Sequence, residues 1–170
     1  ANKRKTLLKR GTMALSEINK MQPTAAMLVI GDEILSGRTQ DTNTQFIAKK
    51  LTEVGINLKE VRVIADCNKN IVSAVNNLRK SYNYVFTSGG IGPTHDDITA
   101  DAIANAFGVA ISVREDARQM LSSHYSDGEK SLNEARLRMA RIPNGASLID
   151  NPISKAPGFS LENVHVMAGV

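Results

Sequence analysis

Five acidic residues stand where chemistry is plausible, each shortly after a segment whose pattern predicts a strand. They are Asp32 and Glu33 after residues 25–30, Asp66 after residues 56–65, and Asp96 and Asp97 after residues 84–87. Ligands of open parallel sheets bind outside the carboxyl ends of the strands, so these side chains should converge at one edge. Clustered carboxylates suit Mg²⁺, which takes oxygen ligands from carboxylates and substrate phosphates together. Taken alone, Asp96 and Asp97 would more simply be helix caps.

A glycine-rich loop separates the third predicted strand from the helix after it. It contains Ser88, Gly89, Gly90, Gly92, Pro93 and Thr94. Glycine adopts backbone angles closed to other residues, so the N–H groups of this loop can approach an anion just ahead of a helix N-terminus. This favours a phosphate-binding loop, although a tight turn between strand and helix fits the composition as well. The loop lacks both the Gly-Lys-Ser/Thr of a Walker loop and the spacing of a dinucleotide fingerprint.

Three further side chains are weaker candidates. Lys155, in a loop rich in proline and glycine over residues 151–159, is either a phosphate contact or a solvated lysine. His95 is an acid–base candidate, but a single loop histidine is more often exposed and without a chemical role. Cys67 has no histidine near it in the sequence, which argues against a nucleophile.

Three strand–helix pairs are predicted to position these residues. The strands are the continuous apolar run 25–30, the alternating segment 56–65 with a register change near Glu60, and residues 84–87. The helices are 42–54, capped by Thr42 or Thr44 and stopped by Gly55, then 68–81, and 99–107, stopped by Gly108. Strand–helix alternation predicts an α/β fold with a mostly parallel sheet and right-handed crossovers.

The last third of the chain has a less regular pattern. Residues 114–125 and 132–140 are predicted helices, and residues 147–149 and 164–167 are predicted strands with the loop 151–159 between them. The sequence stops directly after the last of these strands, as expected of a fragment of a longer protein. The expected organisation is a basic tail over residues 1–23 and one domain over residues 24–170.

Composition and charge exclude several classes of protein. Of the formal net charge of +4, residues 1–23 contribute +5, so the rest of the chain is close to neutral. Nucleic-acid binding would therefore depend on the tail, and the few aromatic residues disfavour an RNA-binding platform. No apolar run approaches the roughly 20 residues that span a bilayer, so no membrane partner is expected. The single cysteine, Cys67, excludes an intramolecular disulfide and fits a reducing compartment, and we expect a cytoplasmic protein.

Four ordered motifs are distinctive in combination. They are Gly-Asp-Glu-Ile-Leu-Ser-Gly at 31–37, Asp-Thr-Asn at 41–43, Gly-Gly-Ile-Gly-Pro-Thr-His-Asp-Asp-Ile-Thr at 89–99, and Asn-Pro through Ala-Pro-Gly-Phe at 151–159. Together they resemble the molybdopterin-binding domain family of molybdenum-cofactor biosynthesis. The pattern looks most like the branch found in CinA-type competence/damage-inducible proteins and in eukaryotic FAD synthases. The resemblance runs from about Ala25 to Val170.

This resemblance implies a three-layer αβα fold, a cleft at the strand ends and a homo-oligomer, either a trimer or a dimer. Matched by motif, the two aspartates that the family links to adenylylation of molybdopterin or to metal insertion fall on Asp66 and Asp97. In the CinA-like branch, the domain is associated instead with metal-dependent hydrolysis of nucleotide pyrophosphates such as ADP-ribose. The relative in FAD synthases is associated with hydrolysis of FAD.

The expected site combines these motifs with the strand ends. Asp66 and Asp97 are the expected catalytic residues, and Asp97 with Glu33 is the expected metal-binding pair. The expected ligand contacts are Gly31, Asp32, Glu33, Thr42, Asn43, Ser88, Gly89, Gly90, Gly92, Pro93, Thr94, Thr99, Lys155, Pro157 and Gly158. Mg²⁺ or another divalent metal is the expected cofactor, a small pterin or nucleotide is the expected partner, and molybdopterin is one candidate ligand.

Three functions remain open on the sequence alone. The leading hypothesis is a metal-dependent nucleotide pyrophosphatase, in which the glycine loop binds phosphate and the carboxylates place Mg²⁺ or orient a water molecule. The second is a role other than hydrolysis at the same site. It is either a non-catalytic module that binds molybdopterin or a nucleotide, or an enzyme that adenylylates molybdopterin. The third is a nucleic-acid accessory protein, which predicts salt-dependent binding that disappears when residues 1–12 are removed.

Overall fold

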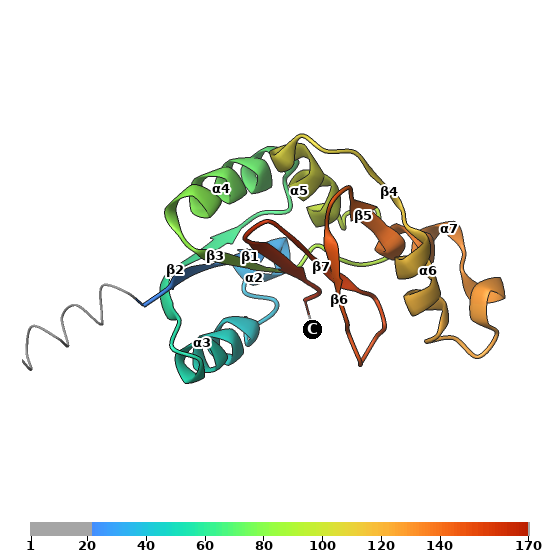
Figure 1. The fold of residues 1–170 in the computed structure, drawn as a ribbon, viewed down its shortest axis with the longest axis horizontal. Helices are drawn as coiled ribbons and strands as arrows, with labels where there is room; N and C mark the ends of the chain where they lie inside the picture. Colours follow the sequence, from blue (N-terminus) through green and yellow to red (C-terminus); the bar gives the residue numbers. More distant parts are fainter. Residues whose placement is uncertain (1–21, 170) are drawn as a thin grey trace, which may run out of the picture.

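A six-stranded sheet forms the centre of the computed structural model, which describes residues 22–169 (Figure 1). The strand order is β2-β1-β3-β8-β7-β6; the first four strands are parallel, and β7 is antiparallel to both of its neighbours. The strands are β1 Thr24–Ile30, β2 Asn57–Ile64, β3 Tyr84–Ser88, β6 Ser147–Ile149, β7 Gly158–Leu161 and β8 Val164–Met167. The predicted α/β class with a mostly parallel sheet is confirmed. The predicted tail lies outside the described residues except for Gln22 and Pro23.

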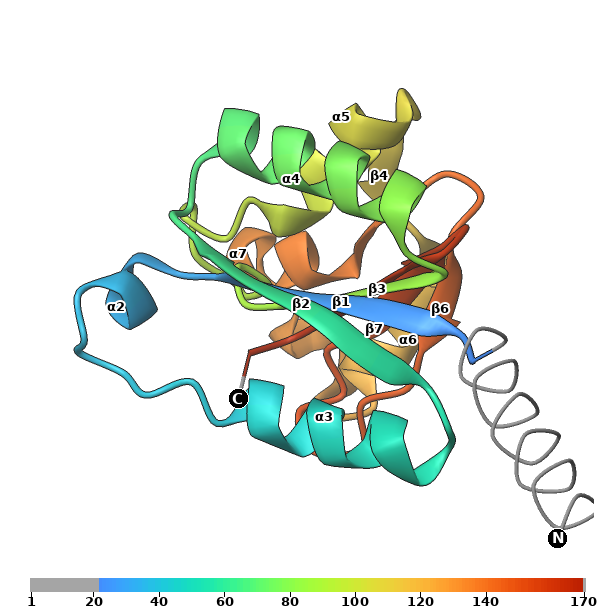
Figure 2. The ribbon, with the colours of Figure 1, turned by 90° about the vertical axis from the view of Figure 1, so that its left-hand side faces the viewer.

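Helices cover both faces of this sheet (Figure 2). Helices α4 (Asn68–Ser81) and α5 (Thr99–Phe107) lie side by side on one face, and α3 (Asn43–Glu53) lies on the other. The sequence of β1 explains why, because every residue from Ala25 to Ile30 is buried, and a strand that is apolar on both faces requires a layer on each. Within residues 22–169, no helix is both long enough and apolar enough to cross a membrane.

The main core lies between the sheet and the α4–α5 layer. Helix α4 turns Ile71, Val75 and Leu78 inward at helical spacing, and each is at most 1% exposed. They pack in one cluster with the side chains of β1 and β8 that point to this face, including Leu28 and Val166. This packing fixes the carboxyl ends of the parallel strands at one edge of the sheet.

A second, smaller unit lies between α5 and β6. Its two-stranded sheet pairs β4 (Ile111–Val113) with β5 (Arg141–Pro143) in antiparallel register. Between these strands the chain forms α6 (Glu115–Ser122), η1 (Gly128–Ser131), α7 (Glu134–Leu137) and η2 (Arg138–Ala140). In Figure 1 this unit gathers at the end of the molecule away from α3 and α4. It contacts the main body through α5, which leads directly from the glycine loop.

Several predicted elements coincide with the observed ones. The helices predicted at 68–81 and 99–107 are α4 and α5, and Gly108 ends α5 in the left-handed conformation, with φ of 65°. The predicted register change in β2 is confirmed, because the partners of Ala25 and Ala26 are Leu58 and Glu60, which skips one residue.

Two predictions were wrong in detail, and a third was right in position only. The helix predicted at 132–140 begins only at Glu134, where the Asn133 side chain accepts a hydrogen bond from Arg136 N, and it tightens into a 3₁₀ turn at Arg138. The predicted loop 151–159 gives way to β7 at Gly158, where a Cβ atom would lie 2.4 Å from Val166 O. Thr42 is the N-cap residue of α3, one of the two predicted alternatives, but its side chain makes no capping hydrogen bond; Asp41 Oδ1 accepts from Thr44 N instead.

Candidate functional site

The ends of β1, β2 and β3 meet at one edge of the sheet, as parallel pairing requires. Gly31 N donates to Ile64 O at 3.0 Å, and Asp32 N donates to Asp66 Oδ2 at the same distance. The segments that follow β1 and β2 are thus tied together directly. Asp66 Oδ1 remains on the side of the glycine loop, 3.4 Å from where a Cβ atom on Gly90 would stand. The expected convergence of acidic residues is therefore visible around Asp66.

Asp66 lies in an electrostatic environment that opposes its charge. Burial raises the pKa of the Asp66 carboxyl, the hydrogen bond from Asp32 N lowers this pKa, and the negative charges of Glu33, Asp32 and Asp97 raise it again. Four carboxylates therefore act on one another at this edge. A bound cation would relieve that repulsion.

Three of the acidic side chains lie against glycines. A Cβ atom would come within 2.5 Å of Glu33 Oε1 if placed on Gly31, and within 2.6 Å of Asp97 Oδ2 if placed on Gly92. On Gly90 it would collide with Thr99 Oγ1 at 2.1 Å, beside Asp66. Any larger residue at these positions would displace a neighbouring side chain. The glycines of the site therefore make room for its carboxylates.

The glycine loop itself is shaped by close backbone contacts. Gly89 and Gly90 have φ of 101° and 64°, and a Cβ atom on Gly89 would lie 2.0 Å from Ile30 O. Thr99 closes the loop, because its Oγ1 donates to Gly89 O at 3.0 Å and its N donates to Gly90 O at 3.1 Å. Glycine is thus required for the handover from β3 to α5, whatever the loop binds.

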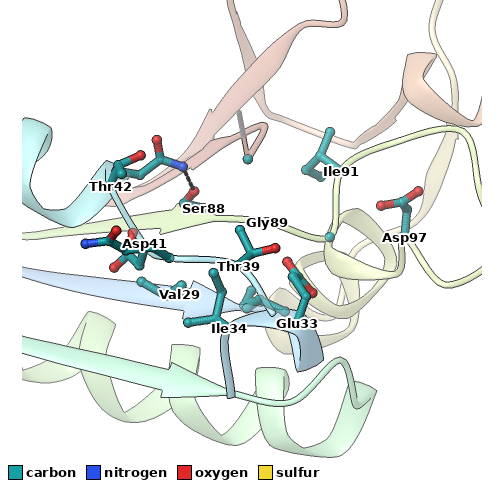
Figure 3. Close-up of a pocket in the computed structure, with 15 residues that line it drawn as sticks. Val29, Glu33, Ile34, Thr39, Asp41, Thr42, Ser88, Gly89, Ile91 and Asp97 are labelled. Atoms are coloured by element: carbon teal, nitrogen blue, oxygen red, sulfur yellow. Dashed lines mark hydrogen bonds between the residues drawn. The ribbon is translucent and has the colours of Figure 1, made fainter. Parts of the chain in front are cut away.

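A cavity of about 260 Å³ opens between this loop and the segment before α3 (Figure 3). Glu33 and Asp97 lie toward one end of it, and Asp41 and Thr42 lie at the other. Next to Thr42 in the sequence, Asn43 donates from Nδ2 to Ser88 Oγ at 2.7 Å. The predicted site residues on its lining are Glu33, Thr42, Asn43, Ser88, Gly89, Gly90 and Asp97. It therefore offers the carboxylate of Asp41 beside a hydroxyl group at one end and the carboxylates of Glu33 and Asp97 at the other.

A second cavity, of about 330 Å³, adjoins the first at Glu33. Its lining is strongly charged and consists of Asp32, Glu33, Arg38, Asp66, His95, Asp96 and Ile98. Arg38 brings a positive charge to this acidic wall, and its Nε donates to Ser36 Oγ at 3.1 Å. The His95 side chain is 90% exposed and contacts Asp96 at 3.1 Å, which places it at the rim.

The remaining predicted residues do not line either cavity. Gly31, Gly92, Thr94 and Thr99 act behind the lining, since they contact Glu33, Asp97 or Gly89, and Pro93 adjoins them. Lys155, Pro157 and Gly158 lie in and after the loop that leads to β7. Gly158 packs against the backbone of Val166, so its requirement for glycine arises from strand packing.

Sequence reasoning missed several lining residues. They are Ile34, Arg38, Thr39, Gln40, Ile91 and Gly169. Residues 38–40 lie in the connection between α2 (Asp32–Leu35) and α3, which has no periodic pattern to mark it. Gly169 follows β8 and approaches Gly89. A Cβ atom placed on Gly169 would lie 3.2 Å from Gly89 Cα. Its only sequence signal is that it follows the end of a parallel strand.

The acidic residues do not form a ready-made metal cage in this part of the chain. Among residues 22–169, no group of three or more His, Cys, Asp or Glu side chains is arranged to bind a metal ion. The oxygen donors at the edge of the sheet nevertheless have the chemistry that Mg²⁺ prefers, because Mg²⁺ commonly takes one or two carboxylates and completes its shell with water and substrate phosphates.

Comparison with known sequences agrees with this geometry. Residues 26–170 match the family described as the probable molybdopterin binding domain. A protein from Metallosphaera sedula is 40% identical over 81% of this chain and 52% of its own length. A putative competence-damage inducible protein from Natranaerobius thermophilus is 34% identical over 80% of this chain and 34% of its own. A probable FAD synthase from Caenorhabditis briggsae is 35% identical over 86% of this chain and 32% of its own length. The chain thus spans about half or less of these relatives.

Solved structures extend the comparison. The protein CinA from Thermoplasma acidophilum superposes with a TM-score of 0.78 at 34% identity, over 86% of this chain and 89% of that one. The tungsten cofactor synthesizing protein MoaB from Pyrococcus furiosus shares the fold, with a TM-score of 0.56. It is 17% identical in sequence, and the superposition covers 88% of this chain and 84% of that one. Motifs, fold and relatives agree, and the chain belongs to the molybdopterin-binding domain family, in its CinA-like branch.

Proposed function

We propose that this domain binds a nucleotide or pterin that carries a phosphate anhydride and hydrolyses that anhydride with the help of a divalent metal. The observation that carries the proposal is the meeting of two cavities at Glu33. The first offers hydroxyl, amide and glycine backbone groups beside the carboxylates of Asp41 and Asp97, and the second offers further carboxylates and Arg38. An elongated substrate can place its ring system in the first cavity and its phosphates at the boundary. The likeness to probable FAD synthases supports a dinucleotide such as FAD or ADP-ribose.

Each group of site residues has a different role in the proposed reaction. Backbone N–H groups of loop 89–92 bind phosphate oxygens, and Arg38 neutralises further negative charge. Asn43 and Ser88, already bonded to each other, orient the ring or sugar. Asp97 orients the attacking water at the cavity, while Asp66 faces the loop through Oδ1. Pyrophosphate hydrolysis of this kind depends on positioning and on charge stabilisation.

A divalent metal fits the donor set at this edge. Asp97 and Glu33 would bind it, with Asp66 and Asp32 close enough to contribute charge. When bound, Mg²⁺ supplies Lewis-acid stabilisation of the negative charge on the anhydride. Burial raises the pKa of Asp66, and the negative charges of Glu33, Asp32 and Asp97 raise it further; this unfavourable charge is the feature of the protein that supports a cation here.

A product assay tests the proposal. ADP-ribose, FAD and ATP are incubated with the native chain, with and without Mg²⁺ or Co²⁺, and with Asp97→Ala and Asp127→Ala. Asp127 is an exposed aspartate in the turn before η1, so its replacement controls for the loss of one negative charge. We expect metal-dependent release of a nucleoside monophosphate that falls at least about 100-fold in Asp97→Ala and stays unchanged in Asp127→Ala.

Two outcomes would contradict parts of this proposal. Unchanged turnover in Asp97→Ala would remove Asp97 from the reaction. Tight binding of a pterin or nucleotide with no product, across several divalent metals, would instead indicate a binding module, which the family description as a probable molybdopterin binding domain also favours. Formation of an adenylylated pterin from ATP would indicate cofactor synthesis.

A further inference from the structure

Arg138 extends from η2 to the loop that carries Asp97. Its Nε donates to Thr94 O at 3.2 Å, and its Nη2 lies 3.5 Å from Asp97 O. These contacts join positions more than forty residues apart in the chain. A guanidinium presents several N–H donors in one plane, so a single side chain can reach two carbonyls at once. Arg138 therefore spans both ends of the segment 94–97.

The segment 94–97 is a closed turn. Apart from those with Arg138, the hydrogen bonds of this turn join its own residues to one another. Asp97 N donates to Thr94 O at 3.2 Å, and Asp97 Oδ2 accepts from Thr94 N at 2.9 Å and from Thr94 Oγ1 at 2.6 Å. His95 and Asp96 contact each other. In the described part of the chain, the hydrogen bonds from Arg138 are the ones that tie this turn to another element. The turn fixes its own shape, and Arg138 fixes its place.

The element that carries Arg138 is itself well anchored. Three residues later, Arg141 forms two hydrogen bonds with Asp101 in α5, at 2.8 and 2.7 Å. Between the two arginines, Ala140 is fully buried. Arg138 thus extends from an anchored element toward the turn 94–97, and Asp97 at the end of that turn lines the cavity (Figure 3).

We propose that Arg138 is a positioning residue, which holds the carbonyls of Thr94 and Asp97 so that the Asp97 carboxylate stays at the wall of the cavity. The kinetic consequence rests on the proposed function, because it requires that Asp97 acts on the substrate. The structural consequence does not, since the order of the turn is measurable in a chain that turns over nothing.

The test compares Arg138→Ala and Arg138→Lys with Arg136→Ala. Arg136 is a matched control, because it lies two residues earlier, donates to Ser131 O at 2.6 Å and stacks over the Tyr125 ring at 4.2 Å. ¹⁵N relaxation is measured at residues 94–97 in each protein. We expect order parameters near 0.85 in the native chain and in Arg136→Ala, and below about 0.6 in Arg138→Ala. Lysine carries its donors on one nitrogen and lacks the planar fork by which Arg138 reaches Thr94 O through Nε and Asp97 O through Nη2, so Arg138→Lys should give intermediate values.

Kinetics supply the second readout. Arg138→Ala should lower kcat at least tenfold and change KM less than threefold, because the substrate contacts remain while Asp97 is misplaced. Arg136→Ala should leave both constants unchanged. Should Arg138→Ala fail to fold, Arg138→Lys is compared with the native chain in its place.

The outcomes separate this proposal from the proposed function. Unchanged order parameters at residues 94–97 in the Arg138 variants would overturn the positioning role, even if activity fell. A native chain that forms no product, but whose turn loses order in Arg138→Ala, would contradict the hydrolase and leave the positioning role supported. Equal loss of kcat in the Arg138 and Arg136 variants would show a general effect of the smaller unit and would overturn the proposal.

Discussion

Asp66 is kept in surroundings that make its charge costly. Burial and the neighbouring carboxylates raise the pKa of Asp66 in the folded chain above its unfolded value of about 3.9. Folding therefore favours the protonated carboxyl, so its contribution to stability is present below the unfolded pKa and is lost as the pH rises through the folded pKa. At neutral pH the ionised group is destabilising, as is common where a site is built for function.

Replacing Asp66 with Asn should raise stability at pH 7 and abolish the proposed hydrolysis. The amide oxygen can still accept from Asp32 N, while the charge repulsion disappears. Because solvent screens this part-exposed group, the gain should stay below about 1 kcal/mol, and it should vanish near pH 3, below the unfolded pKa of about 3.9. Urea unfolding at the two pH values measures it. A loss of stability at pH 7 would show that the stronger hydrogen bond to an ionised carboxylate outweighs the repulsion.

Gly92→Ala should disable the site with little effect on stability. The new Cβ atom would lie 2.6 Å from Asp97 Oδ2, so the carboxylate must move and its bonds to Thr94 must break. The loop around Gly92 is part-exposed, and we expect at least a tenfold loss of turnover at a cost below about 1 kcal/mol.

Gly108→Ala provides the opposite control. Gly108 has φ of 65°, and no atom lies within 4 Å of the place that a Cβ atom would take, so alanine there costs about 1 kcal/mol of backbone strain without touching the site. Urea unfolding and the product assay are applied to both variants. Full turnover in Gly92→Ala would show that the position of Asp97 is unimportant.

At the level of elements, helices and strands with a periodic pattern of apolar residues were predicted from the sequence, and segments without such a pattern were missed. Helices α4 and α5 were predicted to the residue, because apolar stripes and the stop at Gly108 mark them. The carboxylates at the strand ends followed from parallel topology alone. Strands β4 and β5 have three residues each, too few to show alternation. The lining residues between α2 and α3 depend on where an irregular segment folds back, which no local pattern encodes.

The pair Asp101–Arg141 should contribute measurably to how α5 is held. It links the first turn of α5 to β5 through two hydrogen bonds, and both side chains are about 30% exposed. A double-mutant cycle with Asp101→Ala and Arg141→Ala, followed by urea unfolding, should give a coupling of about 1 kcal/mol. The matched exposed pair, Lys50–Glu53, is 57% and 60% exposed and should couple by less than about 0.5 kcal/mol. Equal couplings would show that solvent screens both pairs alike.

Across the whole molecule, the acidic site and a row of stacked rings lie on different parts of the six-stranded sheet. Its carboxyl edge carries the acidic site, while the face opposite the α4–α5 layer carries a row of rings. Phe86 stacks with His165 at 5.1 Å between ring centroids, and Tyr84 lies 6.0 Å from His165. Ser160 Oγ forms a 2.8 Å hydrogen bond with His165 Nδ1. These contacts join β3, β8 and β7, so His165 links the parallel half of the sheet to its antiparallel end.

Mild acid should weaken the whole fold through His165. Burial lowers the pKa of His165 in the folded chain, so its contribution to stability is full above the unfolded pKa of about 6.5 and is lost as the pH falls below that value through the folded pKa. The ring is only half-buried, so the loss should stay below about 1 kcal/mol. Urea unfolding at pH 7.5 and 5.5 measures it, and His165→Phe should remove it while keeping the ring stack. His95→Gln is the control for the loss of one histidine, because the His95 side chain is 90% exposed. If His165→Phe retains the native pH dependence, His165 is not the source of the acid sensitivity.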